Sequence, residues 1–109
     1  MRAPALVLLL AAALGAAGCS SSDDSRQGLR AQGRAIFRSA GCGHCHTLAA
    51  AGAHGHVGPD FDTSERLTRA QILQELNAGV GGMPSFRRRL SDRQEAALAE
   101  FLYRATRQR

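Results

Sequence analysis

The sequence predicts an all-α domain of three to four helices. Three segments carry apolar residues at helical spacing, and no segment shows the apolar–polar alternation of a half-buried strand. The chain has 109 residues, with no Trp, four Phe and one Tyr, which is little material for a core. Chains this short usually need a disulfide, a metal or another group to fold. The sequence therefore excludes a large multidomain enzyme and predicts one small domain that something besides its side chains stabilises.

The first eighteen residues have the pattern of a bacterial export signal. Arg2 gives a positive start, and the sixteen residues 3–18 are uncharged, rich in Leu and Ala, and end in small residues. This stretch is shorter than the roughly 20 apolar residues of a membrane-spanning helix. We therefore expect residues 1–18 to be a signal peptide, so that the rest of the chain works outside the cytoplasm.

Cys19 follows this segment directly. Residues 16–19 resemble the lipobox at which bacterial lipoproteins are cleaved and lipidated on the cysteine, although Ala16 stands where that family prefers Leu. The polar run that follows is typical of a flexible tether. We expect residues 19–25 to form a lipidated tether at the periplasmic or extracytoplasmic face of a bacterial membrane. Ordinary cleavage, an uncleaved anchor and a spare thiol at Cys19 are the alternatives.

The domain itself is expected over residues 26–109, and its first helix over about residues 26–40, with Ser25 or Asp24 as the N-cap. A glycine inside a helix costs about 1 kcal/mol relative to Ala. A glycine at position 33 makes sense if another helix crosses closely there, and a weak helix that tolerates the glycine is the alternative. The residues on this face of the helix are Leu29, Gly33, Ile36, Phe37 and Ala40.

Two capping boxes mark the starts of the other helices. Thr68 with Gln71 predicts the start of the second helix, which Gly79 ends, and Ser91 with Gln94 predicts the start of the third. Residues 47–66 show neither helical nor strand periodicity. A loop of that length in a compact domain is usually functional, and it often wraps around something.

The chemistry-bearing motif is Cys42-Gly43-His44-Cys45-His46, a C-x-x-C-H pattern typical of c-type haem attachment. Two thiols at this spacing can add to the two vinyl groups of one haem, and the adjoining His46 can reach the iron. A thioredoxin-like pair would follow a strand and begin a helix. Here a helix precedes the pair and a loop follows, which favours haem.

A zinc or copper site is the alternative for the same residues. Cys42, Cys45 and His46 would then be completed by His54 and His56 from the loop. We expect these two histidines to be solvated, with a second metal site or replacement of the methionine ligand as alternatives. His44, inside the motif, is expected to point outward.

From about residue 26 to residue 109 the chain resembles a class I cytochrome c of the small monohaem bacterial form. The resemblance implies a cytochrome c fold whose helices wrap around one covalently bound haem c, with the first and last helices crossing. It implies that Gly33 and Phe37 meet Phe101 at this crossing. The matching segments are Gly33 with Phe37, the C-x-x-C-H motif, Gly58-Pro59-Asp60-Phe61, Gly82-Met83-Pro84, and Leu98 with Phe101.

The same resemblance implies the roles of the site residues. Cys42 and Cys45 would carry the thioether bonds, and His46 would be the proximal axial ligand of the iron. Met83 would be the distal ligand, and its thioether would raise the reduction potential. The carbonyl of Pro59 would accept a hydrogen bond from the ring of His46 and so orient it.

These roles imply a single-electron carrier between respiratory or other redox partners, and not an enzyme, because both axial positions of the iron are filled. The alternative is a haem sensor or gas-binding module in which Met83 is labile. We expect a monomer without a small-molecule substrate. Nucleic acid is not an expected partner, since the chain is short, exported and lacks a reading motif.

The formal charge is +5, and all fourteen basic residues besides histidine are Arg. Arg87-Arg88-Arg89 follows the methionine segment, where the family exposes one haem edge. A basic rim there can steer docking with an acidic redox partner. A solvated run that merely keeps the protein soluble is the alternative.

Overall fold

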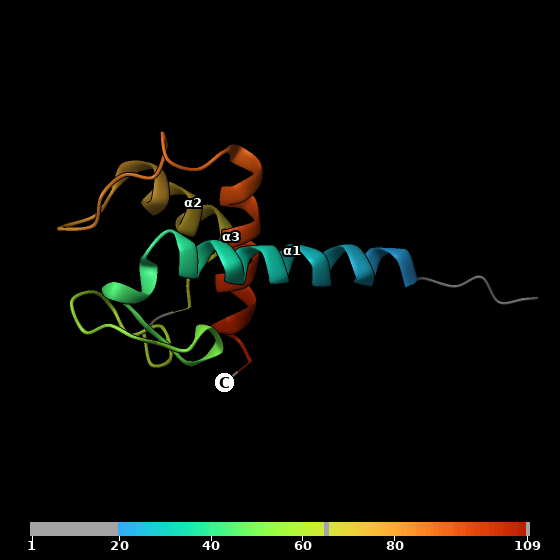
Figure 1. Ribbon diagram of the computed structural model, residues 1–109, viewed down its shortest axis with the longest axis horizontal. Coiled ribbons are helices and arrows are strands. Elements are labelled where there is room, and N and C mark those ends of the chain that lie inside the picture. The colour runs from blue at the N-terminus through green and yellow to red at the C-terminus, as the bar shows by residue number, and fades with distance from the viewer. Residues whose placement is uncertain (1–19, 65, 109) are drawn as a thin grey trace, which may run out of the picture.

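The computed structural model describes residues 20–64 and 66–108, so the predicted signal peptide and Cys19 lie outside the described residues. Figure 1 shows a long helix α1 that passes over α3, with α2 packed beside α3 and loops gathered at one end. The predicted all-α architecture is confirmed. The elements are α1 (Ser20–Ser39), η1 (Cys42–His44), β1 (Thr47–Leu48), η2 (Ala49–Ala51), β2 (Ala53–His54), α2 (Arg69–Ala78) and α3 (Asp92–Ala105).

The crossing of α1 and α3 depends on Gly33. A Cβ atom placed there would lie 2.1 Å from the carbonyl oxygen of Ala97 and 2.5 Å from the Cβ of Phe101. No side chain fits at that separation, so glycine is required for the two backbones to approach. The ring of Phe37, one turn later, meets Phe101 edge-on with centroids 6.0 Å apart. The predicted crossing of the first and last helices is thus confirmed.

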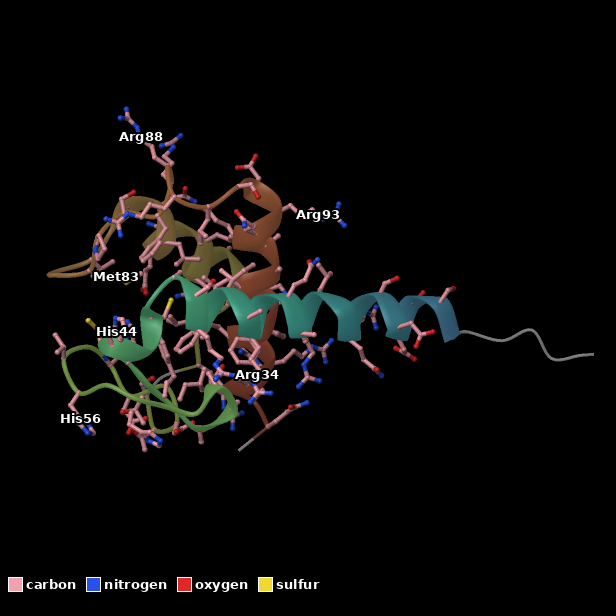
Figure 2. All side chains as sticks on the ribbon, viewed as in Figure 1. Arg34, His44, His56, Met83, Arg88 and Arg93 are labelled. Carbon is pink, nitrogen blue, oxygen red and sulfur yellow. The ribbon has the colours of Figure 1, made fainter. Side chains whose placement is uncertain are left out.

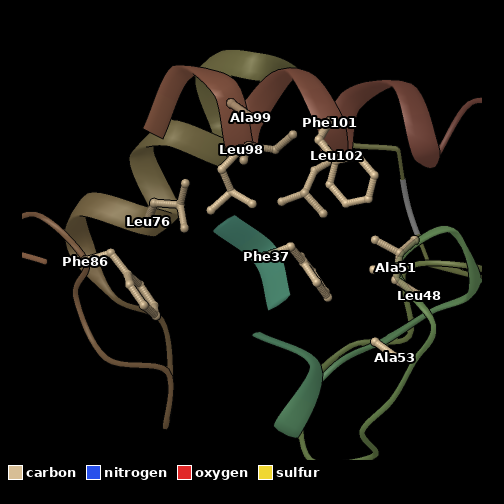
Figure 3. Close-up of a cluster of buried hydrophobic side chains, with 11 residues drawn as sticks. Phe37, Leu48, Ala51, Ala53, Leu76, Phe86, Leu98, Ala99, Phe101 and Leu102 are labelled. Atoms are coloured by element: carbon tan, nitrogen blue, oxygen red, sulfur yellow. The ribbon is translucent and has the colours of Figure 1, made fainter. Parts of the chain in front are cut away.

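The core lies beneath this crossing and draws side chains from all three α-helices and from the loops (Figure 3). Burial of a large apolar side chain contributes about 1.5–3 kcal/mol, and since few side chains here are large, the core is modest. Several core members are only alanine. The side chains labelled in the figure are Phe37, Leu48, Ala51, Ala53, Leu76, Phe86, Leu98, Ala99, Phe101 and Leu102.

Both predicted capping boxes are present. The Thr68 hydroxyl accepts from the backbone N–H of Gln71 at 3.2 Å, and the Gln71 side chain accepts from the N–H of Thr68 at 2.9 Å. Ser91 and Gln94 make the same pair of bonds at the start of α3. Gly79 ends α2 with a φ of 69°, a conformation that favours glycine.

The structure differs from the expected tether. Because α1 begins at Ser20 instead of near residue 26, residues 20–25 are helical and not a flexible polar segment. Within this first part of the helix, the side chain of Ser25 donates to the carbonyl of Ser21 at 2.8 Å. Asp23 in the first turn is favourably placed against the helix dipole. The exposed start of α1 projects beyond the rest of the domain (Figure 1).

A second difference is a small antiparallel sheet in the segment expected to be loop. Thr47 pairs with His54, and Leu48 pairs with Ala53. Each strand has two residues, which is too short to show alternation in the sequence. The pairing closes the loop beneath α1 and buries Leu48 in the core.

A polar cluster ties the start of α2 to the end of α3. The carboxylate of Glu100 accepts from Arg69 Nε at 2.5 Å and from Arg104 Nε at 2.9 Å. The hydrogen bond from Arg69 holds the pKa of Glu100 below its ordinary value. The guanidinium groups of Arg69 and Arg107 lie 3.5 and 3.7 Å from the ring centroid of Tyr103.

Candidate functional site

A cavity of about 640 Å³ opens between α2, the loop after it and the C-x-x-C-H segment. Residues far apart in the sequence meet on its wall, and they include each residue expected to hold or orient a haem. In Figure 2, Met83 and His44 mark the end of the molecule at which the cavity lies, away from the start of α1. The expected haem residues on its wall are Cys42, Cys45, His46, Pro59 and Met83.

The two cysteines sit on one turn of backbone. Gly41, with a φ of 80°, follows α1 and is the N-cap of the short helix η1. The N–H groups of Cys45 and His46 both donate to the carbonyl of Cys42, at 3.2 and 2.9 Å. Burial raises the pKa of the Cys42 thiol to about 11. Cys45 is exposed.

His46 is buried and held on three sides. Its Nδ1 lies 2.9 Å from the carbonyl oxygen of Pro59. A carbonyl only accepts, so Nδ1 carries the hydrogen and Nε2 keeps a lone pair for a metal. The ring of Phe61 stacks on the imidazole with centroids 4.5 Å apart. A Cβ at Gly58 would lie 2.6 Å from the imidazole Cε1, so only glycine fits there.

Backbone hydrogen bonds hold this loop against the motif. The N–H of Gly58 donates to the carbonyl of Cys45 at 2.7 Å, and the N–H of Gly55 donates to the carbonyl of His46 at 3.2 Å. Phe61 is fixed by its own N–H, which donates to the carbonyl of Thr47 at 2.9 Å. The long loop therefore wraps around the attachment motif and positions the groups that surround His46.

Met83 reaches the cavity from a loop that leaves the end of α2. Gly79 starts this loop, and the N–H of Met83 donates to the carbonyl of Val80 at 2.9 Å. The loop is tied back to α2 where the N–H of Phe86 donates to the carbonyl of Leu76 at 2.8 Å. The side chain of Met83 is half-buried and lines the cavity.

The remaining histidines lie elsewhere. His44, His54 and His56 are exposed, and in Figure 2 His56 points away from the molecule. Within residues 20–64 and 66–108, no group of three or more His, Cys, Asp and Glu side chains could hold a metal ion. The described part of the chain therefore does not assemble the ligand set of the zinc or copper alternative.

The donor set on the cavity wall fits a haem c. It offers two thiols for thioether bonds, one imidazole whose Nε2 is left free by the bond to Pro59, and one thioether sulfur from Met83. The other lining residues are largely apolar, as a macrocycle requires. Four of them are Phe61, Ile72, Leu76 and Leu102.

Two contacts of His46 were not recognised in the sequence. Gly58 and Phe61 appeared only as members of the segment Gly58-Pro59-Asp60-Phe61. The available signal was their spacing, since Gly58 and Phe61 flank the proline whose carbonyl faces His46. That spacing alone does not show that Gly58 and Phe61 both contact the imidazole of His46.

Comparisons with known proteins bear on the family and the fold of the chain. A family model described as "Cytochrome C oxidase, cbb3-type, subunit III" matches residues 28–102. Among solved structures, the chain is similar to the c-type cytochrome SorU from Sinorhizobium meliloti. The two are 32% identical with a TM-score of 0.67, over 73% of this chain and 93% of that chain. No curated protein sequence matches the chain at a significant level.

Proposed function

Because the chain belongs to the family of cytochrome c oxidase, cbb3-type, subunit III, and is a small c-type cytochrome, we propose that it carries single electrons on a haem c with His46 and Met83 as axial ligands. The observation that carries this proposal is the cavity wall on which Cys42, Cys45, His46 and Met83 meet. Covalently bound haem c is the cofactor that the family implies.

When bound, haem c supplies an iron that gains and loses one electron. Cys42 and Cys45 would hold the macrocycle by thioether bonds. His46 and Met83 would fill both axial positions, which leaves no place for substrate or oxygen. The hydrogen bond from His46 to Pro59 fixes the tautomer of the ligand and raises its basicity. The thioether of Met83 would favour the reduced state and so raise the potential.

Optical spectra of the ferric and ferrous holoprotein test the ligation. We expect a low-spin spectrum, a methionine-sulfur-to-iron charge-transfer band in the ferric form, and slow binding of CO in the ferrous form. Met83→Ala should lose the band and bind CO rapidly, whereas Val80→Ala, in the same loop, should keep both properties. A high-spin wild type, or one that binds CO rapidly, would support the sensor alternative instead.

The basic run Arg87-Arg88-Arg89, which follows the loop that carries Met83, supports docking with an acidic redox protein. Arg87, Arg88 and Arg89 are exposed, and in Figure 2 Arg88 projects away from the molecule. Such a rim raises association rates at low ionic strength.

The paired variant Arg87→Gln/Arg88→Gln tests this docking surface. It should slow association with an acidic redox protein, and the difference should shrink as salt is added. The matched control is Arg34→Gln/Arg38→Gln, which removes two exposed arginines from α1. Equal slowing by both pairs would indicate net charge and not a docking surface.

We also propose that Cys19 is lipidated and holds the domain at the extracytoplasmic face of a membrane. The support is the lipobox resemblance at residues 16–19. None of the helices in the described part of the chain is long and apolar enough to cross a membrane. Cys19→Ala should move the exported protein from the membrane fraction to the soluble fraction. A wild type that is already soluble would contradict the anchor.

A further inference from the structure

We propose that Glu95 is a positioning residue for the methionine loop, residues 79–86, and that it acts through Asn77 at the end of α2. This inference rests on the proposed ligation of iron by Met83. Neither Glu95 nor Asn77 lines the cavity. Their effect would therefore be exerted on the loop that carries the ligand and not on the haem itself.

The connection is a chain of hydrogen bonds. Glu95 Oε2 on α3 accepts from Asn77 Nδ2 at 3.1 Å, and the same Nδ2 donates to the carbonyl of Leu73 at 2.9 Å. The backbone carbonyl of Asn77 accepts from Ser85 Oγ at 2.6 Å. Ser85 is two residues beyond Met83. One residue at the end of α2 thus joins α3 on one side to the methionine loop on the other.

The burial of Glu95 supports a positioning role for its hydrogen bond to Asn77. Glu95 is 5% exposed, and its Oε1 has no hydrogen-bond partner within the described residues. Burying an incompletely bonded carboxyl group is unfavourable, and an apolar residue of similar size would often be more stable there. Its place in the first turn of α3 lessens the cost only in part. What the carboxyl group provides, and an apolar group does not, is a fixed orientation for Asn77.

The methionine loop needs such support because its glycine-rich first half is largely exposed. Gly81 and Gly82 are exposed, and a Cβ at either position would meet nothing within 4 Å. Apart from the cap at Gly79, whose N–H donates to the carbonyl of Glu75, the hydrogen bonds that tie the loop to α2 come after Met83, at Ser85 and Phe86. How firmly these contacts hold should therefore set how readily Met83 leaves the iron.

Imidazole binding to the ferric holoprotein measures this directly, because imidazole competes with Met83 for the iron. Its apparent affinity rises with the fraction of molecules in which the methionine is released. We expect Ser85→Ala and Glu95→Leu to bind imidazole roughly three- to tenfold more tightly, the range for one lost hydrogen bond. Both should also have a lower reduction potential. Glu95→Gln keeps an acceptor for Asn77 and should stay close to the wild type.

The matched control is Ser39→Ala, which removes an exposed serine on α1 whose Oγ donates to the carbonyl of Ile36 at 3.3 Å. It should bind imidazole as the wild type does. If Glu95 acts through the bond at Ser85, the variant with both changes should resemble the stronger single variant. Effects that simply add would overturn that route. Should Glu95→Leu fail to fold, Ser85→Ala still tests the route, because unchanged imidazole binding in that variant would overturn it.

The outcomes separate this inference from the proposed ligation. A wild type with the methionine charge-transfer band, together with Ser85→Ala and Glu95→Leu variants that fold and bind imidazole unchanged, overturns the positioning role and leaves the ligation standing. A wild type without the band overturns both. If Ser39→Ala bound imidazole as tightly as Ser85→Ala does, and more tightly than the wild type, the positioning role would also be overturned.

Discussion

The ring of Phe61 stacks on the imidazole of His46, with centroids 4.5 Å apart and planes inclined by 20°. Phe61 in turn meets Phe37 edge-on, with centroids 6.5 Å apart, and Phe37 meets Phe101. A continuous series of aromatic contacts therefore joins His46 to the crossing of α1 and α3. The orientation of the histidine is thus set by the hydrophobic core as well as by the carbonyl of Pro59.

Replacing Phe61 with Leu should loosen His46. We expect the holoprotein to lose about 1 kcal/mol of unfolding free energy, the value of one aromatic contact. The reduction potential should fall, because water reaching the site favours the more highly charged ferric state. Redox titration and thermal unfolding measure the two effects. Phe61→Tyr keeps the ring and should retain most of the stability and most of the reduction potential. If both quantities fell as far in Phe61→Tyr as in Phe61→Leu, the result would argue against the stacking contact.

Gly33 and Gly28 offer a matched pair in one helix. Gly33→Ala would place a methyl group against the Ala97 carbonyl, and we expect a loss of about 3 kcal/mol or more. A Cβ at Gly28 meets nothing within 4 Å, so Gly28→Ala should stabilise the helix by about 0.5–1 kcal/mol. Melting curves of the two holoproteins measure both effects. If both substitutions shifted the melting temperature in the same direction, the close crossing at Gly33 would not be the cause of the destabilisation.

The contribution of Glu100 should depend on pH. Its pKa is lowered in the folded state, chiefly by the hydrogen bond from Arg69, so its stabilising effect is present above the unfolded pKa of about 4.3. That effect is lost as the pH falls through the folded pKa. Glu100→Gln should therefore cost about 1.5–3 kcal/mol at neutral pH, the range for bonds to a charged group, and progressively less in acid.

Thermal melts of the wild type and Glu100→Gln between neutral and acid pH test this dependence. Asp92→Asn is a suitable control, since Asp92 is an exposed acidic residue in the first turn of the same helix. A difference between the wild type and Glu100→Gln that stays constant from neutral pH into strong acid would contradict the ion-pair interpretation.

The domain should not fold well without its haem. The cavity wall is largely apolar, and in a protein without haem its half-buried side chains, such as Phe61, Leu67 and Met83, would face water. Cys42→Ser/Cys45→Ser prevents thioether formation, and we expect this variant to be largely unfolded or molten, without a sharp calorimetric transition. A cooperative, sharply melting apoprotein would contradict this expectation.

Local signals in the sequence predicted local structure well. The two capping boxes and the glycine that ends α2 depend on neighbouring residues only, and each lies where it was expected. The close crossing at Gly33 was predictable because a glycine on an apolar helix face weakens the helix, and a close approach of two backbones offsets that cost. The C-x-x-C-H motif predicted the haem, because chemistry fixes its spacing.

Three other features were not predictable from the sequence. The helical start of α1 was expected to be a tether, because serine and aspartate also favour flexible segments. The two-residue strands carry no periodic signal. The bond between Asn77 and Glu95 joins positions eighteen residues apart that only the packing of α2 against α3 brings together.

Attachment of one haem to Cys42 and Cys45 is tested most directly on the native exported protein, by a pyridine haemochrome assay followed by mass spectrometry. We expect a c-type haemochrome with one haem per chain. The added mass should remain after denaturation and map to the peptide that contains residues 42–46. A denatured chain that carries no covalent haem would contradict the attachment at these two cysteines.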